Sequence, residues 1–228
     1  MDKQPDPTQP TEFSLVKQTF YAIWENGPLL AILSLLLGVV SVPSISLILA
    51  EVPLYAIVPL VGLVLPVWAA LQAIQARMLE GKVARFGAFV RSIPLYWSRA
   101  ALFGLLLAVP IVLGLFTVPL LNLEEVPTFV WAALFADGFC ALALVAISLY
   151  FFPLLGLHNL AFRTALLDAA ILATRLPFHT MGLIGMAVLF VYAIRWQPAL
   201  GFFLPTVWAM FAVNNCRYVL SREGKGLS

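Results

Sequence analysis

Six runs of mostly apolar residues divide this chain, and each approaches the length that a helix needs to cross a membrane. A transmembrane helix requires about 20 apolar residues to span about 30 Å of hydrocarbon. Of the 228 residues, 62% are hydrophobic and 11% are charged, whereas a soluble domain is usually about 45–50% apolar and about 25% charged. The sequence therefore predicts an all-α integral membrane bundle of six transmembrane helices. The predicted spans cover residues 28–50, 54–76, 100–121, 129–156, 176–194 and 199–213.

The flanking segments are more polar, and they define the predicted domain organisation. Residues 1–27 mix acids, lysines and prolines, and Phe20, Ile23 and Trp24 recur there at helical spacing. We expect a cytoplasmic tail followed by a short amphipathic helix on the membrane surface, without a cleavable signal. The transmembrane domain covers residues 28–216, and residues 217–228 form a second cytoplasmic tail.

Lysine and arginine positions predict the orientation of the helices. If the N-terminus is inside, 12 of the 13 basic residues fall on the inner side and only Arg195 falls outside. Because basic loop residues are retained in the cytoplasm, this bias predicts a multi-pass protein of the cell membrane with cytoplasmic N- and C-termini. Seven basic residues are candidates for contacts with lipid phosphates. They are Arg77, Lys82, Arg85, Arg91, Arg163, Arg175 and Arg217.

Two inner segments carry apolar residues at helical spacing beside basic residues. In residues 77–99, Phe86 and Phe89 belong to an apolar stripe that leaves Arg91 to one side. In residues 160–180, Ala165 and Ile171 belong to a similar stripe. Each pattern predicts a cytoplasmic, interfacial amphipathic helix, which would either anchor the chain at the bilayer or dock a partner.

The second, fourth and sixth predicted spans share a pattern at their inner ends: a proline is followed by two uncharged polar residues and then an arginine. This pattern predicts repeats in parallel orientation. It also predicts three polar clusters at one membrane face. Glutamine, asparagine and histidine offer donors and acceptors suited to a hydroxyl-rich ligand, so these side chains are the ligand-binding candidates. The alternative is that they are ordinary interface residues. The three sets are Pro66, Gln72, Gln75 and Arg77; Pro153, His158, Asn159 and Arg163; and Pro205, Asn214, Asn215 and Arg217.

Asp137 is an acidic residue expected within the fourth predicted span. Intramembrane carboxylates are costly and usually face a bundle interior or water. Its expected partners are Arg195, Tyr192 or a carbonyl freed near Pro110. The residue is either a proton-coupling group or a protonated, structurally hydrogen-bonded one.

Missing motifs exclude several classes of function. The chain has no G-x-x-x-x-G-K-[ST] loop, no nucleophile elbow and no basic run suited to nucleic acid. His158 and His179 stand 21 residues apart without other ligands at metal spacing, and Cys140 and Cys216 are predicted to be packing residues. We therefore expect no enzyme activity, no cofactor, no metal site and no nucleic-acid partner.

The stretches LPVWAALQAIQARMLEG, FGAFVRSIPLYWSRA, YFFPLLGLHNLAF and LLDAAILATRLPFHT resemble the YesL-like family, small bacterial multi-pass membrane proteins of unassigned activity. The resemblance covers roughly residues 30–218. One departure is that a Val-Thr-x-Gly stretch often seen in the family is replaced by Val67, Trp68 and Ala69. Similar members are often encoded beside carbohydrate-uptake systems and polysaccharide-degrading enzymes, which implies a part in oligosaccharide import across the bacterial inner membrane.

These observations predict an accessory or transport component for oligosaccharide uptake with a polar cavity at its cytoplasmic side. The expected partners are the lipid bilayer, a carbohydrate ABC importer and an oligosaccharide ligand. The competing hypothesis is a non-transporting structural or regulatory protein that docks another membrane complex through its inner amphipathic helices.

Overall fold

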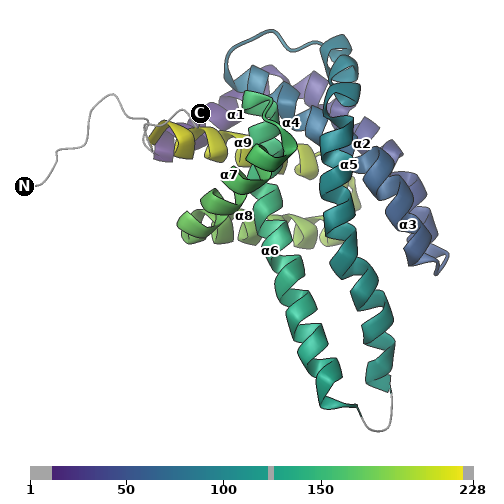
Figure 1. Ribbon diagram of the computed structural model, residues 1–228. Helices are drawn as coiled ribbons and strands as arrows, with labels where there is room; N and C mark the ends of the chain where they lie inside the picture. Colours follow the sequence, from purple (N-terminus) through teal and green to yellow (C-terminus); the bar gives the residue numbers. More distant parts are fainter. Residues whose placement is uncertain (1–11, 123–125, 223–228) are drawn as a thin grey trace, which may run out of the picture.

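Helices make up the regular secondary structure in the computed structural model, which describes residues 12–122 and 126–222 (Figure 1). The predicted all-α class is confirmed for these residues. In chain order the elements are α1 (Glu12–Glu25), α2 (Gly27–Leu49), α3 (Pro53–Pro59), the π-helical η1 (Leu60–Val64), α4 (Leu65–Leu79), α5 (Phe86–Thr117), the 3-10 helix η2 (Val118–Asn122), α6 (Thr128–His158), α7 (Phe162–Arg175), α8 (Pro177–Trp196), the 3-10 helix η3 (Pro198–Phe202) and α9 (Leu204–Arg222).

Five helical segments in the described residues are long and apolar enough to cross a membrane, as expected for a multi-pass membrane protein. They overlap the first five predicted spans. The sixth predicted span, residues 199–213, falls on η3 and α9, which are not among the five. Asn214, Asn215 and Arg217 lower the hydropathy of α9. The five segments are Gly27–Leu49, Pro53–Leu79, Phe86–Asn122, Thr128–His158 and Pro177–Trp196.

Helix α4 is the central element of the fold. Twelve of its fifteen residues are buried, including Gln72 and Gln75, and α4 packs against α5, α6 and α9. Alanines occupy many of its contact positions, and small residues allow membrane helices to approach closely. The most buried polar side chains predicted as ligand-binding candidates therefore lie inside the bundle.

A proline explains the irregular backbone just before α4. Pro66 has no N–H to donate to the carbonyl of Gly62 one turn back, and its ring crowds that turn. The chain widens into the π-helical η1 at this point. The indole N–H of Trp97 on α5 donates to the Gly62 carbonyl oxygen at 2.9 Å, so the acceptor freed by the proline is satisfied from a neighbouring helix.

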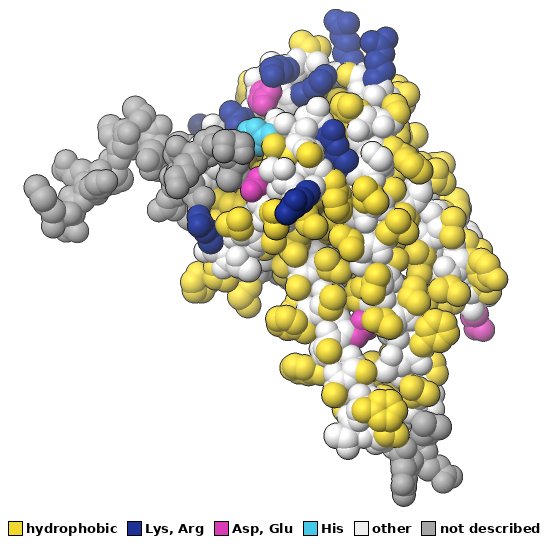
Figure 2. Space-filling view, viewed as in Figure 1, with side chains coloured by type: hydrophobic (Ala, Val, Ile, Leu, Met, Phe, Trp, Pro, Cys, Tyr) yellow, Lys and Arg dark blue, Asp and Glu magenta, His cyan; other side chains and the backbone are white. Residues whose placement is uncertain are grey.

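Helices α5 and α6 form a long hairpin that extends beyond the rest of the bundle (Figure 1). Residues 100–157, which form most of this hairpin, contain no lysine or arginine. On the face drawn in Figure 2, hydrophobic side chains cover the projecting part, whereas lysine and arginine side chains gather toward the opposite end of the molecule. The charge distribution is therefore strongly polarised along the hairpin.

Of the three amphipathic segments expected from the sequence, two form separate helices and one does not. Residues 86–99 do not form a separate interfacial helix, because they are the first turns of the continuous helix α5. Helix α7 is separate, and its Ala165, Ala169 and Leu172 pack against the bundle. Helix α1 is also separate; its Thr19 and Ala22 are buried, while Trp24 is 88% exposed.

Helices α4 and α9 pack together in a way that matches the predicted repeat. Trp68 stacks on Trp208 with ring centroids 5.8 Å apart, near the start of both helices. Near the other end, the guanidinium of Arg217 donates to the carbonyl oxygen of Leu79. Equivalent ends are therefore adjacent, as expected for two copies in parallel orientation.

Candidate functional site

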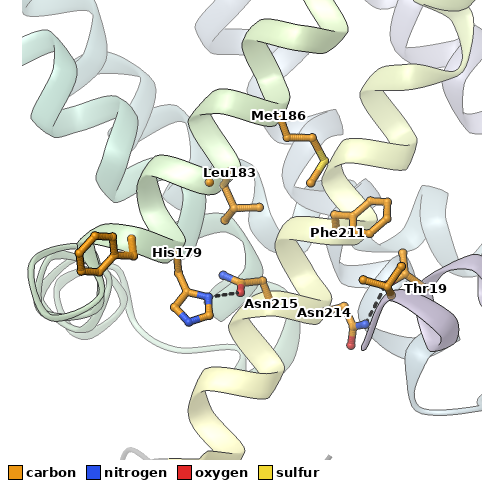
Figure 3. A pocket seen from close by; sticks show the side chains of 10 residues that line it. Thr19, His179, Leu183, Met186, Phe211, Asn214 and Asn215 are labelled. Carbon is orange, nitrogen blue, oxygen red and sulfur yellow. Dashed lines mark hydrogen bonds between the residues drawn. The ribbon is translucent and has the colours of Figure 1, made fainter. Parts of the chain in front are cut away.

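The best candidate for a ligand site is a groove between α1, α8 and α9 (Figure 3). Its volume is about 430 Å³, within the range of about 300–1,000 Å³ that is usual for small-molecule sites. Four polar side chains line it: Thr19, His179, Asn214 and Asn215. Its remaining lining is Val16, Phe178, Gly182, Leu183, Met186 and Phe211.

Two hydrogen bonds connect the helices that border the groove (Figure 3). His179 Nδ1 on α8 lies 3.1 Å from Asn215 Oδ1 on α9. Because an amide oxygen only accepts, His179 Nδ1 is the donor in this hydrogen bond. Asn214 Nδ2 donates to Thr19 Oγ1 of α1 at 2.7 Å, so neighbouring residues on α9 bind opposite walls.

A buried polar layer lies behind the groove. The Thr180 hydroxyl donates to the Leu176 carbonyl oxygen at 2.9 Å, so the Tyr150 hydroxyl of α6 donates to Thr180 Oγ1 at 3.1 Å. Asn215, which lines the groove, also interacts with the Tyr150 hydroxyl. Amide and hydroxyl groups therefore continue from the largely apolar groove into the bundle behind it.

Gln75 lies in a second polar cluster, inside the packing of α2, α4 and α9, and Gln72 is buried one turn earlier on α4. Gln75 Nε2 donates to the Thr206 carbonyl oxygen at 2.7 Å, and the Thr206 and Ser34 hydroxyls are hydrogen-bonded to each other. The Oε1 atoms of both glutamines are buried and have no partner among the described residues. Gln75 connects α4 to α9, and neither glutamine lines the groove.

His158 and Asn159 are exposed and lie outside the groove. Asn159 ends α6 in the left-handed conformation, with φ of 49°, which asparagine tolerates better than most residues. Its Oδ1 accepts a hydrogen bond from Arg99 of α5 at 2.6 Å. The structure thus places the six predicted ligand-binding side chains in three locations, and only Asn214 and Asn215 line the groove.

The basic residues predicted to contact lipid phosphates also differ in their surroundings. Arg217 binds the last carbonyl of α4, where a cation also complements the helix dipole. Lys82 pairs with Glu80 at 2.6 Å. Arg163 and Arg175 are exposed on α7. The remaining three, Arg77, Arg85 and Arg91, line one pocket together.

Asp137 lines a cavity of about 330 Å³ between α5 and α6, together with Pro110 and Cys140. Its Oδ1 is buried and has no partner among the described residues. The expected contacts with Arg195 and Tyr192 are not formed, because both of those side chains are exposed on α8 and neither lines this cavity. Pro110 lines the same cavity, but among the described residues Asp137 forms no hydrogen bond to the carbonyl expected there.

Sequence reasoning missed Thr19, His179 and the aromatic lining of the groove. His179 follows Pro177 at the start of α8, and Thr19 lies within the apolar pattern of α1. The signal in the sequence is a polar residue on the otherwise apolar face of a helix. Without the arrangement of α1, α8 and α9, that signal does not identify which residues meet.

The described residues that line the groove include neither a cysteine nor a cluster of metal-ligating side chains. Among the described residues, no three His, Cys, Asp or Glu side chains cluster in a way that could hold a metal ion. Cys216 is fully buried and is a packing residue, as predicted. The same prediction is wrong for Cys140, which is exposed on α6.

We expect Cys216 to resist maleimide labelling at pH 7 in the folded protein and to react after denaturation. The reason is that burial blocks access of the reagent to the thiol. The measurement is mass-spectrometric labelling in a Cys140→Ser background. Ser221→Cys, at an exposed position on the same helix, is the positive control. Equal labelling of Cys216 and of the cysteine introduced at 221 before denaturation would contradict the buried position.

No protein-family model, curated protein or solved structure matches this chain.

Proposed function

We propose that this chain is an accessory component of carbohydrate uptake in the cytoplasmic membrane, and that the groove between α1, α8 and α9 binds the sugar. The observation that carries the proposal is the composition of the groove. Amide, imidazole and hydroxyl groups from three helices lie beside the rings of Phe178 and Phe211. Polar groups of this kind pair with sugar hydroxyls, while aromatic rings pack against apolar ring faces.

The choice of sugar among hydroxyl-bearing ligands rests on the resemblance to the YesL-like family. A carbohydrate ABC importer is the corresponding partner. Within this proposal the chain presents the bound oligosaccharide to the importer, since the groove is open along one side and is not a passage through the bundle.

The proposal places α9 across the membrane as a sixth span and both termini in the cytoplasm. The hairpin residues 100–157 carry no basic side chain, and lysine and arginine side chains gather at the opposite end in Figure 2. Arg175 precedes the first residue of α8 by two, and Arg217 follows Asn215 by two. The positive-inside rule therefore favours a groove that faces the cytoplasm.

Binding of oligosaccharides to the full chain in lipid nanodiscs tests the proposal. The probes are neutral and acidic oligosaccharides of two to six sugars, measured by calorimetry. We expect one class to bind and His179→Ala to weaken it about ten-fold, because loss of one hydrogen bond to a ligand costs about 1 kcal/mol or more. Asn215→Leu should have a similar effect, since it removes the partner of His179.

His158→Ala is the matched control, because it removes the chain's other histidine from an exposed position outside the groove. It should leave affinity unchanged. If no oligosaccharide binds to the wild-type chain, or if His158→Ala and His179→Ala weaken binding equally, the groove is not the sugar site.

Docking of another membrane complex is the second candidate function, and the orientation of α1 favours it. Thr19 and Ala22 face the bundle, whereas Phe20, Tyr21 and Trp24 are between 60% and 88% exposed. Large apolar side chains on that face suit either lipid or a partner helix. Failure of every oligosaccharide to bind in the nanodisc experiment would favour this candidate.

A further inference from the structure

Three arginines gather around one pocket at the junction of α4 and α5. The pocket has a volume of about 460 Å³ and is lined by Arg77, Arg85, Gly87, Ala88, Arg91, Ser92 and Leu95. Arg77 lies in the last turn of α4, Arg85 directly precedes α5, and Arg91 lies in its second turn. The reversal of the chain at residues 80–85 brings these cations to one place.

No acidic side chain lines this pocket. The nearby Glu80 already pairs with Lys82 at 2.6 Å, and none of the three arginines has an ion pair or side-chain hydrogen bond within the described residues. Three guanidinium groups offer fifteen donors in a geometry suited to phosphate or carboxylate oxygens. Their mutual repulsion is relieved when a multivalent anion binds among them.

The backbone leaves room for such an anion. A Cβ atom added to Gly87 would meet nothing within 4 Å, so the first turn of α5 is open toward the pocket. N–H groups in the first turn of a helix lack helical acceptors and favour negative charge. In α5 the N–H groups of Ala88 and Phe89 donate to the Arg85 carbonyl oxygen, so those of Phe86 and Gly87 are the candidates for further donors beside the guanidinium groups.

The surface next to the pocket is apolar. Leu95 lines the pocket and is 51% exposed, and the exposed side chains of Leu102 and Leu105 follow along α5. Residues 100–122 of this membrane-spanning segment contain no charged side chain. An anionic headgroup site that continues into an apolar helix surface matches the two parts of a phospholipid.

We propose that Arg77, Arg85 and Arg91 form a phosphate-binding site, and that its ligand is the headgroup phosphate of an anionic phospholipid whose acyl chains lie along α5. The site is separate from the α1/α8/α9 groove and does not depend on sugar binding. The positive-inside rule explains only why basic residues stay on the cytoplasmic side. The proposal adds that these three arginines bind one headgroup together.

Native mass spectrometry of the detergent-purified full chain tests this site. The probes are phosphatidylglycerol, which is anionic, and phosphatidylcholine, whose phosphate is neutralised by its own cation. We expect Arg91→Gln to weaken the first phosphatidylglycerol binding step about five-fold, as one basic contact to an anionic membrane lipid is worth about that factor. Phosphatidylcholine should bind weakly, and equally to the wild-type chain and to Arg91→Gln.

Two further variants separate a bound headgroup from a general charge effect. Arg163→Gln removes the same charge from an exposed position on α7 and should leave the first binding step unchanged. Gly87→Leu keeps every charge but fills the open space and should weaken phosphatidylglycerol binding at least as much as Arg91→Gln. Because Gly87 is exposed, we expect Gly87→Leu to fold like the wild-type chain, and a melting curve checks this.

Inorganic phosphate distinguishes the source of the anion. If millimolar phosphate raises the melting temperature of the wild-type chain but not of Arg91→Gln, and phosphatidylglycerol binds both proteins equally, the phosphate site stands and the lipid assignment is overturned. If neither probe distinguishes the wild-type chain from Arg91→Gln and Gly87→Leu, the whole proposal is overturned.

Discussion

Replacing Gly156 with alanine is expected to lower the free energy of unfolding by about 1–3 kcal/mol, the usual cost of forcing an extra group into a packed core. A Cβ at this position of α6 would lie 2.8 Å from Ala73 Cα and 3.0 Å from Ala73 N on α4. Both are backbone atoms, so no side chain can rotate away. The two helices would have to separate along the central element of the fold.

The measurement is unfolding in mixtures of dodecylmaltoside and sodium dodecyl sulfate, followed by circular dichroism. Gly138→Ala is the matched control, because Gly138 lies on the same helix and a Cβ there would meet nothing within 4 Å. Both variants gain the same helix propensity, so their difference isolates the contact with α4. We expect Gly156→Leu to yield no folded protein. Equal stability of Gly156→Ala and Gly138→Ala would contradict the close approach.

The membrane class and most helix positions could be predicted from the sequence, because apolar runs of this length have few alternatives to helices in a bilayer. The start of α5 could not be predicted in this way. Arg91 and Arg99 interrupt the apolar pattern, which suggested an interfacial helix before a span beginning at residue 100. In the structure α5 is continuous from Phe86 to Thr117, since hydrophobic periodicity alone does not tell a bend from a straight continuation.

The repeated polar residues were informative about packing but not about the direction of each side chain. Trp68 and Trp208 do meet, and Gln75 contacts the backbone of Thr206. Asn159, however, takes the left-handed conformation that ends α6 and binds Arg99. Which side of a helix faces a cavity depends on the rotation of that helix against its neighbours, and this rotation follows from the whole packing arrangement.

Truncation of the aromatic core between α5 and α6 is expected to cause the second large loss of stability. Phe103 is fully buried and stacks on Phe151 with ring centroids 4.5 Å apart, while Phe152 meets Phe103 edge-on at 5.3 Å. In a membrane the separated helices keep their side chains in lipid, so the hydrophobic effect adds little to helix association. The stabilisation by Phe103 therefore comes from close packing and ring contacts.

We expect Phe103→Ala to lower the free energy of unfolding by about 2 kcal/mol, since it leaves a cavity of about 100 Å³ and each Å³ costs about 24 cal/mol. The measurement is the same detergent-mixture unfolding experiment. Phe135→Ala is the matched control, because Phe135 on α6 is 81% exposed and its truncation leaves no cavity. Phe103→Leu should recover part of the loss, because it fills more of the space than alanine. If Phe103→Ala and Phe135→Ala were equally stable, the stacked rings would not hold α5 and α6 together.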